Sequence, residues 1–249
     1  MQRFEDKVAL VTGAGSGIGR ASAERLAAEG AKVFCVDLNA DALEELAESL
    51  RAGGAEAVAW PCDVSDEIAV NEAVAACVNA FGSIYTLVHM AGLLRFERTH
   101  ETDAASWQQI IDINLTGTFY LCKAVLPHLI ESGGNIVNAA STAALAGLHW
   151  GAAYSASKGG VLAMTRSIAV EYADQGVRAN CVCPGDIKTN MTVDITMPDA
   201  PSHEQIVRIS SLGGPKGPEV VAGVIAMLAS EDGAHITGED VRIDGGTLS

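Results

Sequence analysis

The chain of 249 residues fits one large α/β domain better than two small ones. Hydrophobic residues make up 49% of the sequence, which is enough for a core that helices can cover from both sides. The formal net charge of −15 argues against nucleic acid or an anionic membrane as a partner, because no basic patch is present to displace counterions.

Six cysteines occur without the spacing of a zinc site, so we expect buried free thiols and no metal. Cys181 and Cys183 stand two residues apart in an apolar run, a spacing that puts both on one face of a strand. The N-terminal sequence MQRFED has no apolar signal core, and no apolar run reaches membrane-spanning length. A cytoplasmic protein is therefore expected.

Short apolar runs alternate with segments of helical periodicity along the whole chain. The predicted strands are, in order, Val8–Val11, Lys32–Leu38, Ala55–Trp60, Tyr85–His89, Asn135–Ala140, Arg178–Val182 and Asp240–Ile243. The predicted helices are Ile18–Glu29, Asp41–Ala52, Asp66–Phe81, Ser106–Ile130, Ala152–Tyr172 and Glu219–Ser230. Strands joined by crossover helices indicate a doubly wound, mostly parallel sheet with helices on both faces, and we expect a single Rossmann-type domain over residues 1–249.

The stretch Pro184–Pro218 is longer than an ordinary connection and is rich in Pro, Gly and Ser. We expect a substrate lid at about 188–212, in which Ser202–Ser210 could form a short helix. The apolar residues that alternate with polar ones there are Met191, Val193, Ile195 and Met197. A surface loop that only connects a strand to a helix is the alternative.

Glycines follow the first predicted strand in the segment Thr12–Gly19, which reads TGAGSGIG. They let backbone N–H groups approach a pyrophosphate at the start of a helix, where the helix dipole favours an anion. The strict G-x-G-x-x-G fingerprint is absent, because Ile18 stands where its third glycine would be. A tight strand-to-helix corner is the alternative, but the position directly after the first strand favours dinucleotide binding.

Asp37 ends the second predicted strand, eighteen residues after Gly19. A carboxylate at this spacing can accept hydrogen bonds from an adenosine ribose, and it repels a 2′-phosphate. Like charges about 4 Å apart interact by roughly 4 kcal/mol at an effective dielectric of about 20, which is enough to decide the cofactor. No Arg or Lys stands at Ser16, Leu38 or Asn39 to hold a phosphate, so NAD is expected rather than NADP.

Tyr154 and Lys158 stand at positions i and i+4 of a predicted helix, which puts the phenol and the ammonium on one face. A nearby cation stabilises phenolate and lowers the pKa of tyrosine, so Tyr154 is a candidate general acid and base. Ser141 follows a predicted strand, where its hydroxyl could bond a substrate oxygen. Asn114 falls inside a predicted helix, a poor position for Asn unless its amide makes specific contacts.

Together these residues resemble the short-chain dehydrogenase/reductase family in order and spacing. The similar motifs are Thr12–Gly19, Asp63-Val64, Asn114, Ser141, Tyr154, Lys158, Pro184–Thr189, Ile236–Gly238 and Asp244–Gly246. Each motif alone is weak, but the set is specific and spans essentially the whole chain. The resemblance implies an oxidoreductase that moves a hydride between NAD and the carbonyl or alcohol carbon of a small, largely apolar substrate.

The resemblance also implies the roles of four residues. Tyr154 would donate and accept the proton, and Ser141 would orient the substrate carbonyl. Lys158 would hold the nicotinamide ribose and lower the pKa of Tyr154. Asn114 would anchor a water that relays protons through Lys158.

A larger set of residues is expected to contact NAD. These are Gly13, Ser16, Gly17, Ile18, Asp37, Leu38, Asp63, Val64, Met90, Ala91, Gly92, Tyr154, Lys158, Pro184, Gly185, Ile187 and Thr189. By resemblance, Asp63 and Val64 would contact adenine, and Ile187 and Thr189 would hold the nicotinamide carboxamide.

One segment departs from the family pattern, which usually reads Asn-Asn-Ala-Gly after the fourth strand. This chain has His89-Met90-Ala91-Gly92 there. Ala91 and Gly92 keep the close backbone approach to the cofactor. We expect His89 to be a structural histidine with its hydrogen bonds satisfied, and membership of a proton relay is the alternative.

The residues expected by resemblance to line the substrate site are mostly apolar, which favours a hydrophobic ketone or secondary alcohol. They are Leu93, Leu94, Ala143, Leu145, His149, Trp150 and Met191. Trp150 could equally lie at an oligomer contact. By resemblance, the helices near Ser106–Ile130 and Ala152–Tyr172 would pack against their copies, and a contact through the C-terminal strand would complete a homotetramer.

Two other functions compete with this reading. A 3-oxoacyl-[acyl-carrier-protein] reductase is the second candidate function. Such enzymes usually prefer NADP and present basic residues to an acidic carrier. Asp37 and the lack of a basic cluster around Lys123 argue against it. A catalytically silent NAD-binding regulator on the same fold is third, since a fold does not fix a function.

Overall fold

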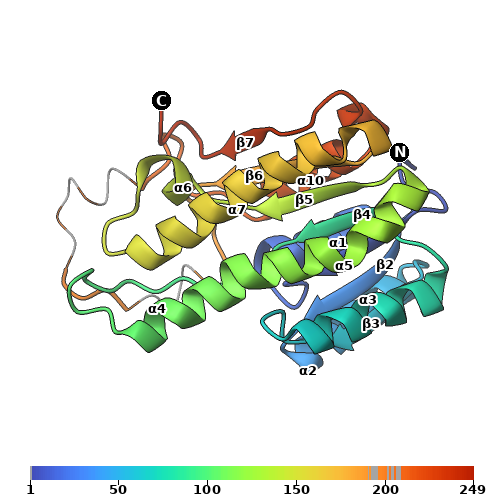
Figure 1. Ribbon diagram of the computed structural model, residues 1–249, viewed down its shortest axis with the longest axis horizontal. Coiled ribbons are helices and arrows are strands. Elements are labelled where there is room, and N and C mark those ends of the chain that lie inside the picture. The colour runs from blue at the N-terminus through green and yellow to red at the C-terminus, as the bar shows by residue number, and fades with distance from the viewer. Residues whose placement is uncertain (1, 190, 192–195, 201, 203–204, 206–208) are drawn as a thin grey trace.

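Seven strands form one parallel sheet in the computed structural model, which describes residues 2–189, 191, 196–200, 202, 205 and 209–249 (Figure 1). The strands are β1 (Val8–Thr12), β2 (Lys32–Asp37), β3 (Ala57–Pro61), β4 (Thr86–His89), β5 (Asn135–Ala139), β6 (Arg178–Pro184) and β7 (Asp240–Ile243). Their order across the sheet is β3-β2-β1-β4-β5-β6-β7, and every neighbouring pair is parallel. The predicted doubly wound fold is confirmed.

Helices cover both faces of this sheet, as the crossover connections require. One face carries α1 (Gly17–Ala28), α2 (Ala40–Ala52) and α10 (Glu219–Ala229). The other carries α3 (Glu67–Phe81), α5 (Gly117–Ser132) and α7 (Ala152–Glu171), with α4 (Ala104–Ile111) at the end of α5 (Figure 1). The shorter elements are η1 (Asp112–Thr116), α6 (Thr142–Ala146), η2 (Ala173–Gln175) and η3 (Glu231–Gly233).

The core lies on both sides of the sheet, and β1 shows why its sequence is apolar throughout. Ala9 and Val11 pack in the cluster that includes α1, α2 and α10. Val8 and Leu10 pack in the cluster that includes α3 and α5. Successive side chains of a strand point to opposite faces, so a strand covered on both faces needs a continuous apolar run.

Element boundaries agree with the sequence-based predictions to within a few residues, with two exceptions. The helix predicted over Ser106–Ile130 runs further at both ends and is interrupted by η1, a π-helical turn at Asp112–Thr116. The short helix α6 was not predicted, because five residues, Thr142–Ala146, are too few to show a period. Asn39 and Asp66 cap α2 and α3, where their side chains accept backbone N–H bonds.

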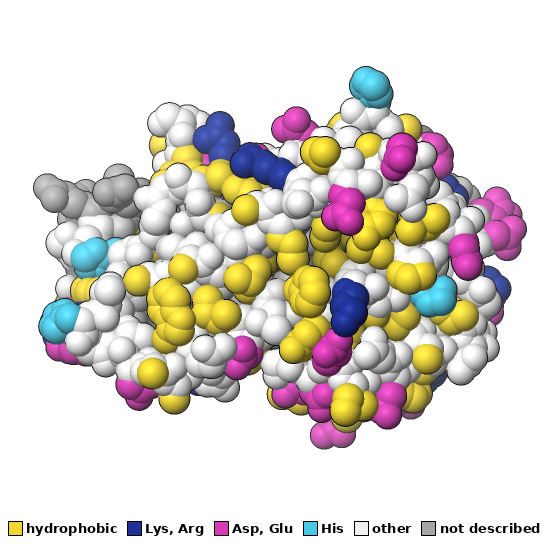
Figure 2. All heavy atoms as spheres, in the orientation of Figure 1, with side chains coloured by type: hydrophobic (Ala, Val, Ile, Leu, Met, Phe, Trp, Pro, Cys, Tyr) yellow, Lys and Arg dark blue, Asp and Glu magenta, His cyan; other side chains and the backbone are white. Residues whose placement is uncertain are grey.

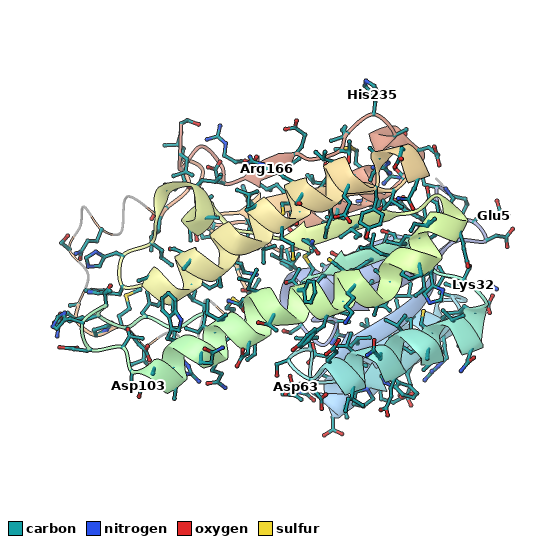
Figure 3. All side chains as sticks on the ribbon, in the orientation of Figure 1. Glu5, Lys32, Asp63, Asp103, Arg166 and His235 are labelled. Carbon is teal, nitrogen blue, oxygen red and sulfur yellow. The ribbon has the colours of Figure 1, made fainter. Side chains whose placement is uncertain are left out.

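Charged contacts tie the outer helices to the sheet and to the loops. Arg166 on α7 forms an ion pair with Asp240 at the start of β7 (Figure 3).

All six cysteines are free and buried, as predicted. Among the described residues, no helix is long and apolar enough to cross a membrane.

The segment proposed as a lid is described in part. Val193, Ile195 and most of Ser202–Ser210 lie outside the described residues. Arg98, in the loop after β4, forms an ion pair with Asp199. Nε2 of the His149 ring lies 2.8 Å from Nε2 of the Gln205 amide. The described part of the segment therefore contacts two loops that follow neighbouring strands.

Candidate active site

The strand order reverses between β1 and β4, and the residues singled out by the sequence meet at the carboxyl ends of these strands. Thr12 and His89, the last residues of the two strands, are partners in the register. In a doubly wound sheet the connections after two such strands run to opposite faces and leave a crevice between them. The glycine turn follows β1 and the segment Met90-Ala91-Gly92 follows β4, so both border this crevice.

The glycine turn is shaped by close backbone approach. Gly13 has a φ of 65°, and a Cβ at this position would lie 2.8 Å from the backbone nitrogen of Ala91. A Cβ on Gly19 would lie 2.1 Å from the carbonyl oxygen of Gly13. Glycine is therefore required at both positions, and the turn holds its backbone at the N-terminus of α1, where a pyrophosphate is favoured.

Asp37 lies against this turn. Its carboxylate accepts hydrogen bonds from the backbone nitrogen of Gly15 at 2.9 Å and from that of Asn39 at 3.0 Å. The carboxylate at the end of β2 is thus fixed next to the phosphate-binding backbone, where the ribose of a dinucleotide would follow its pyrophosphate. The geometry fits the adenosine half of such a cofactor.

Ser141, Tyr154 and Lys158 come together from β5 and α7. Ser141 follows β5 and caps α6, where its Oγ accepts a hydrogen bond from the backbone nitrogen of Ala143 at 3.1 Å. The Ser141 hydroxyl also hydrogen-bonds the phenol of Tyr154. Lys158 donates from Nζ to the carbonyl oxygen of Ala139 at 2.8 Å, and Nζ lies 5.8 Å from the centroid of the Tyr154 ring.

Burial governs the electrostatics of this group. Burial raises the pKa of Tyr154, and the hydrogen bond from Ser141 opposes this rise. The expected lowering of that pKa by Lys158 is therefore reversed, because desolvation of the phenolate is the largest effect on it. Burial also lowers the pKa of Lys158 to about 8.

Asn114 occupies the π-helical turn η1 and is completely buried. Its Oδ1 accepts from the backbone nitrogen of Leu93 at 2.7 Å, and its Nδ2 donates to the carbonyl oxygen of Leu93 at 2.9 Å. Nδ2 also donates to Oγ of Ser157 at 3.0 Å. The amide thus joins the loop after β4 to α7, and π-helical turns of this kind occur frequently at functional sites.

His89 is bonded to the protein through one of its two ring nitrogens. Nδ1 lies 2.6 Å from Oγ1 of Thr12, as a structural histidine would. Nε2, however, has no hydrogen-bond partner among the described residues, although it is shielded from solvent. Burial and the charge of Lys158 lower the pKa of His89 to about 3. Protein groups therefore pair one of the two ring nitrogens, and the satisfaction of both stays a prediction.

A pocket of about 300 Å³ collects most of these residues. The residues expected to contact NAD that line it are Ile18, Met90, Gly92, Tyr154, Lys158, Pro184, Gly185, Ile187 and Thr189. A Cβ on Gly17 would lie 3.2 Å from the side chain of Thr189, so the segment after β6 closes over the glycine turn. The pocket spans the glycine turn, the Tyr154 phenol and the segment after β6.

The other eight expected cofactor contacts are not among the described lining residues of this pocket; they are Gly13, Ser16, Gly17, Asp37, Leu38, Asp63, Val64 and Ala91. Asp63, which follows β3, accepts hydrogen bonds from the backbone nitrogen and hydroxyl of Ser65 (Figure 3). Val64 is buried against Gly117, while Ser16 and Leu38 are exposed. Their roles stay predictions.

The substrate side of the pocket is partly different from the prediction. Leu94, Ala143 and Met191 line it, whereas Leu93, Leu145, His149 and Trp150 are not among its described lining residues. The apolar side chains that the sequence argument missed are Phe96, Leu148 and Ile209, whereas Met197, which was named there as part of the lid, also lines the pocket. They stand in loops beyond the recognised motifs, and large apolar residues within otherwise polar loops were the available signal.

Metal ligation has no support in the described part of the chain, where no group of three or more His, Cys, Asp or Glu side chains comes together.

Comparison with known proteins agrees with this architecture. Residues 7–200 match the family model of the short chain dehydrogenases. The chain is 41% identical over 248 residues to a meso-2,3-butanediol dehydrogenase of Serratia marcescens, covering 99% of this chain and 96% of the relative. It is 36% identical over 249 residues to a cyclohexanol dehydrogenase of Acinetobacter sp. (strain SE19), covering 99% and 97%.

A solved dehydrogenase/reductase from Sinorhizobium meliloti 1021 superposes with a TM-score of 0.90 at 32% identity, covering 98% of this chain and 96% of the other. The chain belongs to the short-chain dehydrogenase family, and its relatives include alcohol and diol dehydrogenases.

Proposed function

We propose that this chain is an NAD-dependent dehydrogenase that interconverts a small, largely apolar secondary alcohol and its ketone. The observation that carries the proposal is the meeting of Ser141, Tyr154 and Lys158 in one pocket with the glycine turn. Alcohol and diol dehydrogenases among the relatives support the same class of reaction.

In this proposal each polar side chain has one task. Tyr154 takes the hydroxyl proton during oxidation and returns it during reduction, while Ser141 holds the substrate oxygen. Lys158 binds the nicotinamide ribose, and Asn114 anchors a water that connects Lys158 to solvent. A bound nicotinamide would supply the hydride acceptor or donor.

The substrate class follows from the described lining of the pocket. Beyond Ser141 and Tyr154, the substrate side is formed by the apolar side chains Leu94, Phe96, Ala143, Leu148, Met191, Met197 and Ile209. The charged side chains among the described lining residues are Lys158 and Asp186. Because Asp186 repels an anionic group and Lys158 is committed to the cofactor, an uncharged substrate is favoured.

The cofactor assignment to NAD rests on Asp37. Its carboxylate is held against the glycine turn by Gly15, where it would accept the ribose hydroxyls and repel a 2′-phosphate. This preference also argues against the 3-oxoacyl-[acyl-carrier-protein] reductase alternative. A silent NAD-binding regulator would not need the buried Ser141–Tyr154 pair.

We further propose that the enzyme is a cytoplasmic homotetramer. Hydrophobic side chains gather along α5 and α7 on the face seen in Figure 2, where Phe119 is 49% and Val170 is 82% exposed. These faces would pack against their copies, and a second two-fold contact through the C-terminal strand would complete the tetramer. A stable, active monomer in light scattering would rule this assembly out.

The segment 188–212 is proposed to close over the substrate. Arg98–Asp199 and His149–Gln205 already link its described part to the loops beside the pocket. Closure would exclude water from hydride transfer. Hydrogen exchange over this segment should slow when NAD and a substrate analogue bind together, and unchanged exchange would mean that it is no lid.

The decisive experiment is Tyr154→Phe, assayed with NAD and a panel that includes cyclohexanol, 2-butanol and 2,3-butanediol. We expect turnover to fall by about a hundredfold to ten-thousandfold, since the phenol transfers the proton. Affinity for NAD should stay within about threefold, because the hydroxyl serves the chemical step.

Tyr172→Phe is the matched control, because it removes a phenol hydroxyl at the far end of α7 and should leave turnover unchanged. Near-normal turnover by Tyr154→Phe would contradict the proposed function.

A further inference from the structure

His89 presents a buried nitrogen that the known parts of the site do not use. The side chain is 1% exposed, and Nδ1 is engaged with Oγ1 of Thr12. Nε2 is shielded from solvent and has no hydrogen-bond partner within the described ranges. An unpaired buried polar group is destabilising, so a native fold pairs it with an ordered water or with a ligand.

The strand register places His89 beside the anchor of Lys158. His89 pairs with Asn138 on β5, and the next residue, Ala139, accepts the hydrogen bond from Nζ of Lys158. The amide of Asn138 is already engaged, because it donates to Oγ1 of Thr165 at 2.9 Å. The imidazole of His89 thus lies near the Lys158 ammonium, and its Nε2 can still form a hydrogen bond.

The loop after β4 brings the same two groups together from the other side. A Cβ on Gly92 would lie 3.3 Å from Nζ of Lys158 and 3.2 Å from Oδ1 of Asn114. Only Met90 and Ala91 lie between His89 and Gly92 along the chain. Polar atoms from β4, η1 and α7 therefore surround one small region, and a buried water needs two to four such partners.

We propose that His89 is a positioning residue for Lys158, and that Nε2 of its neutral ring accepts a hydrogen bond from the ammonium through one buried water. The field of the ammonium favours the tautomer with a lone pair on Nε2, so Nδ1 donates to Oγ1 of Thr12. The ring then links the glycine turn to the group that faces Tyr154. This inference rests on the proposed function, because that function assigns Lys158 its role beside Tyr154.

The titratable groups around the ammonium make its response to pH interpretable. Cys181 and Cys183 on β6 are buried thiols whose pKa is raised to about 12, so they stay neutral. His89 on β4 is neutral as well, because its pKa is lowered to about 3. Tyr154 on α7 is the remaining titratable partner of Lys158 among the described residues.

The test is the pH dependence of kcat for alcohol oxidation in His89→Phe, which keeps an aromatic ring and removes both nitrogens. Without the link, the charged form of Lys158 loses a hydrogen bond, so its pKa falls further and less ammonium is present to stabilise phenolate. The midpoint of the profile should therefore rise by about half a unit, which is about a threefold loss of kcat below the midpoint. His89→Asn, which can still bind a water, should shift the midpoint less.

Thr86→Val is the matched control. Thr86 donates from Oγ1 to Oδ1 of Asn135 at 2.8 Å, so it is another buried polar contact between β4 and β5, at the opposite end of both strands. It should lower Tm without moving the midpoint. An unmoved midpoint in folded His89→Phe would overturn the proposal.

A measurement on the wild-type protein keeps the proposal testable if His89→Phe does not fold. The ¹⁵N resonance of Nε2, assigned by its absence in His89→Asn, should shift as Lys158 titrates near its pKa of about 8. A resonance that stays constant through that range would contradict the link. Failure of the proposed function would instead appear as turnover retained by Tyr154→Phe, which this resonance does not depend on.

Discussion

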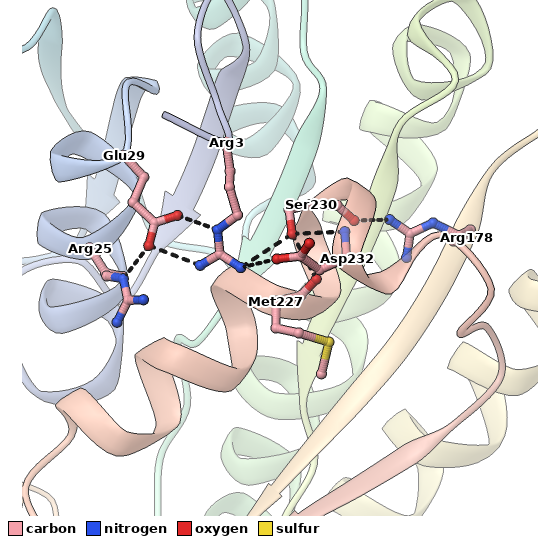
Figure 4. A network of polar contacts seen from close by, with 7 residues as sticks. All are labelled: Arg3, Arg25, Glu29, Arg178, Met227, Ser230 and Asp232. Carbon is pink, nitrogen blue, oxygen red and sulfur yellow. Dashed lines mark hydrogen bonds and ion pairs between the residues drawn. The ribbon is translucent and has the colours of Figure 1, made fainter. Parts of the chain in front are cut away.

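The two ends of the sheet treat polar groups in opposite ways. At the amino ends of the strands, Arg3 donates to both carboxylate oxygens of Glu29, at 2.5 and 2.9 Å, and to Asp232 at 2.8 Å (Figure 4). Arg25 pairs with the same Glu29, and Arg178 donates to the carbonyl oxygen of Ser230 at 3.2 Å (Figure 4). Charges there satisfy one another.

At the carboxyl ends, the polar groups are mostly uncharged and keep unused bonding capacity. Nε2 of His89 has no partner in the described part of the chain, and the ammonium of Lys158, which has three donors, bonds to the carbonyl oxygen of Ala139. Polar groups that are fully paired within the protein contribute to its stability, whereas groups with unused donors or acceptors can bind a ligand. The difference predicts that substitutions at the two ends separate stability from activity.

The largest expected effect concerns the choice of cofactor at the carboxyl end. The ratio of kcat/KM values should favour NAD over NADP by at least about a hundredfold, or about 2.7 kcal/mol. Asp37→Asn keeps the shape of the side chain and removes the charge, so this ratio should fall by about tenfold or more. Asp41→Asn, in the first turn of α2, is the control and should leave the ratio unchanged. Comparable efficiencies of the wild type with both cofactors would refute the role of Asp37.

The next effect concerns stability at the amino end. Glu29→Gln should lower the free energy of unfolding by about 2 kcal/mol, because Glu29 is buried and accepts charged hydrogen bonds from Arg3 and Arg25. Urea denaturation measures this change, and kcat and KM should not move. Glu24→Gln, which removes an exposed i,i+4 partner of Arg20, should change stability by less than about 0.5 kcal/mol.

The carboxylate of Glu29 should also make the free energy of unfolding depend on pH in the acid range. Its hydrogen bond with Arg3 holds the pKa of Glu29 below its ordinary value of 4.5. This contribution is present above that ordinary value and is lost as the pH falls through the lower, folded-state pKa. The unfolding free energy of Glu29→Gln should therefore fall less steeply in acid, and parallel acid profiles of the two proteins would contradict this.

The last prediction concerns the pH dependence of the reaction itself. Because burial raises the pKa of Tyr154, phenolate is scarce at neutral pH. Oxidation should accelerate with pH, by up to about tenfold per unit below that pKa, while ketone reduction should slow once the pH exceeds it. Steady-state rates in both directions check the sign, and an oxidation rate that falls with pH would exclude Tyr154 as the base.

Local patterns predicted the fold well because helices cover both faces of the sheet and the inner strands are largely apolar. The glycine turn and the pair Tyr154 and Lys158 were also recognisable, since their spacing is short along the chain. The unpaired Nε2 of His89 could not be predicted from the sequence, because its surroundings depend on which residues three neighbouring strands place side by side. The rise in the pKa of Tyr154 likewise follows from burial, which the i,i+4 spacing does not reveal.

The π-helical turn at η1 makes the helical stretch from Ala104 to Ser132 sensitive to length. The backbone nitrogen of Gly117 bonds to the carbonyl oxygen of Asp112, five residues earlier, so this stretch holds one residue more than a regular α-helix would. Deleting that residue would restore ordinary winding and turn α4 by about 100° relative to α5. Asn114 would then leave Leu93. Related sequences should therefore vary in residue type along this helix far more freely than in residue number.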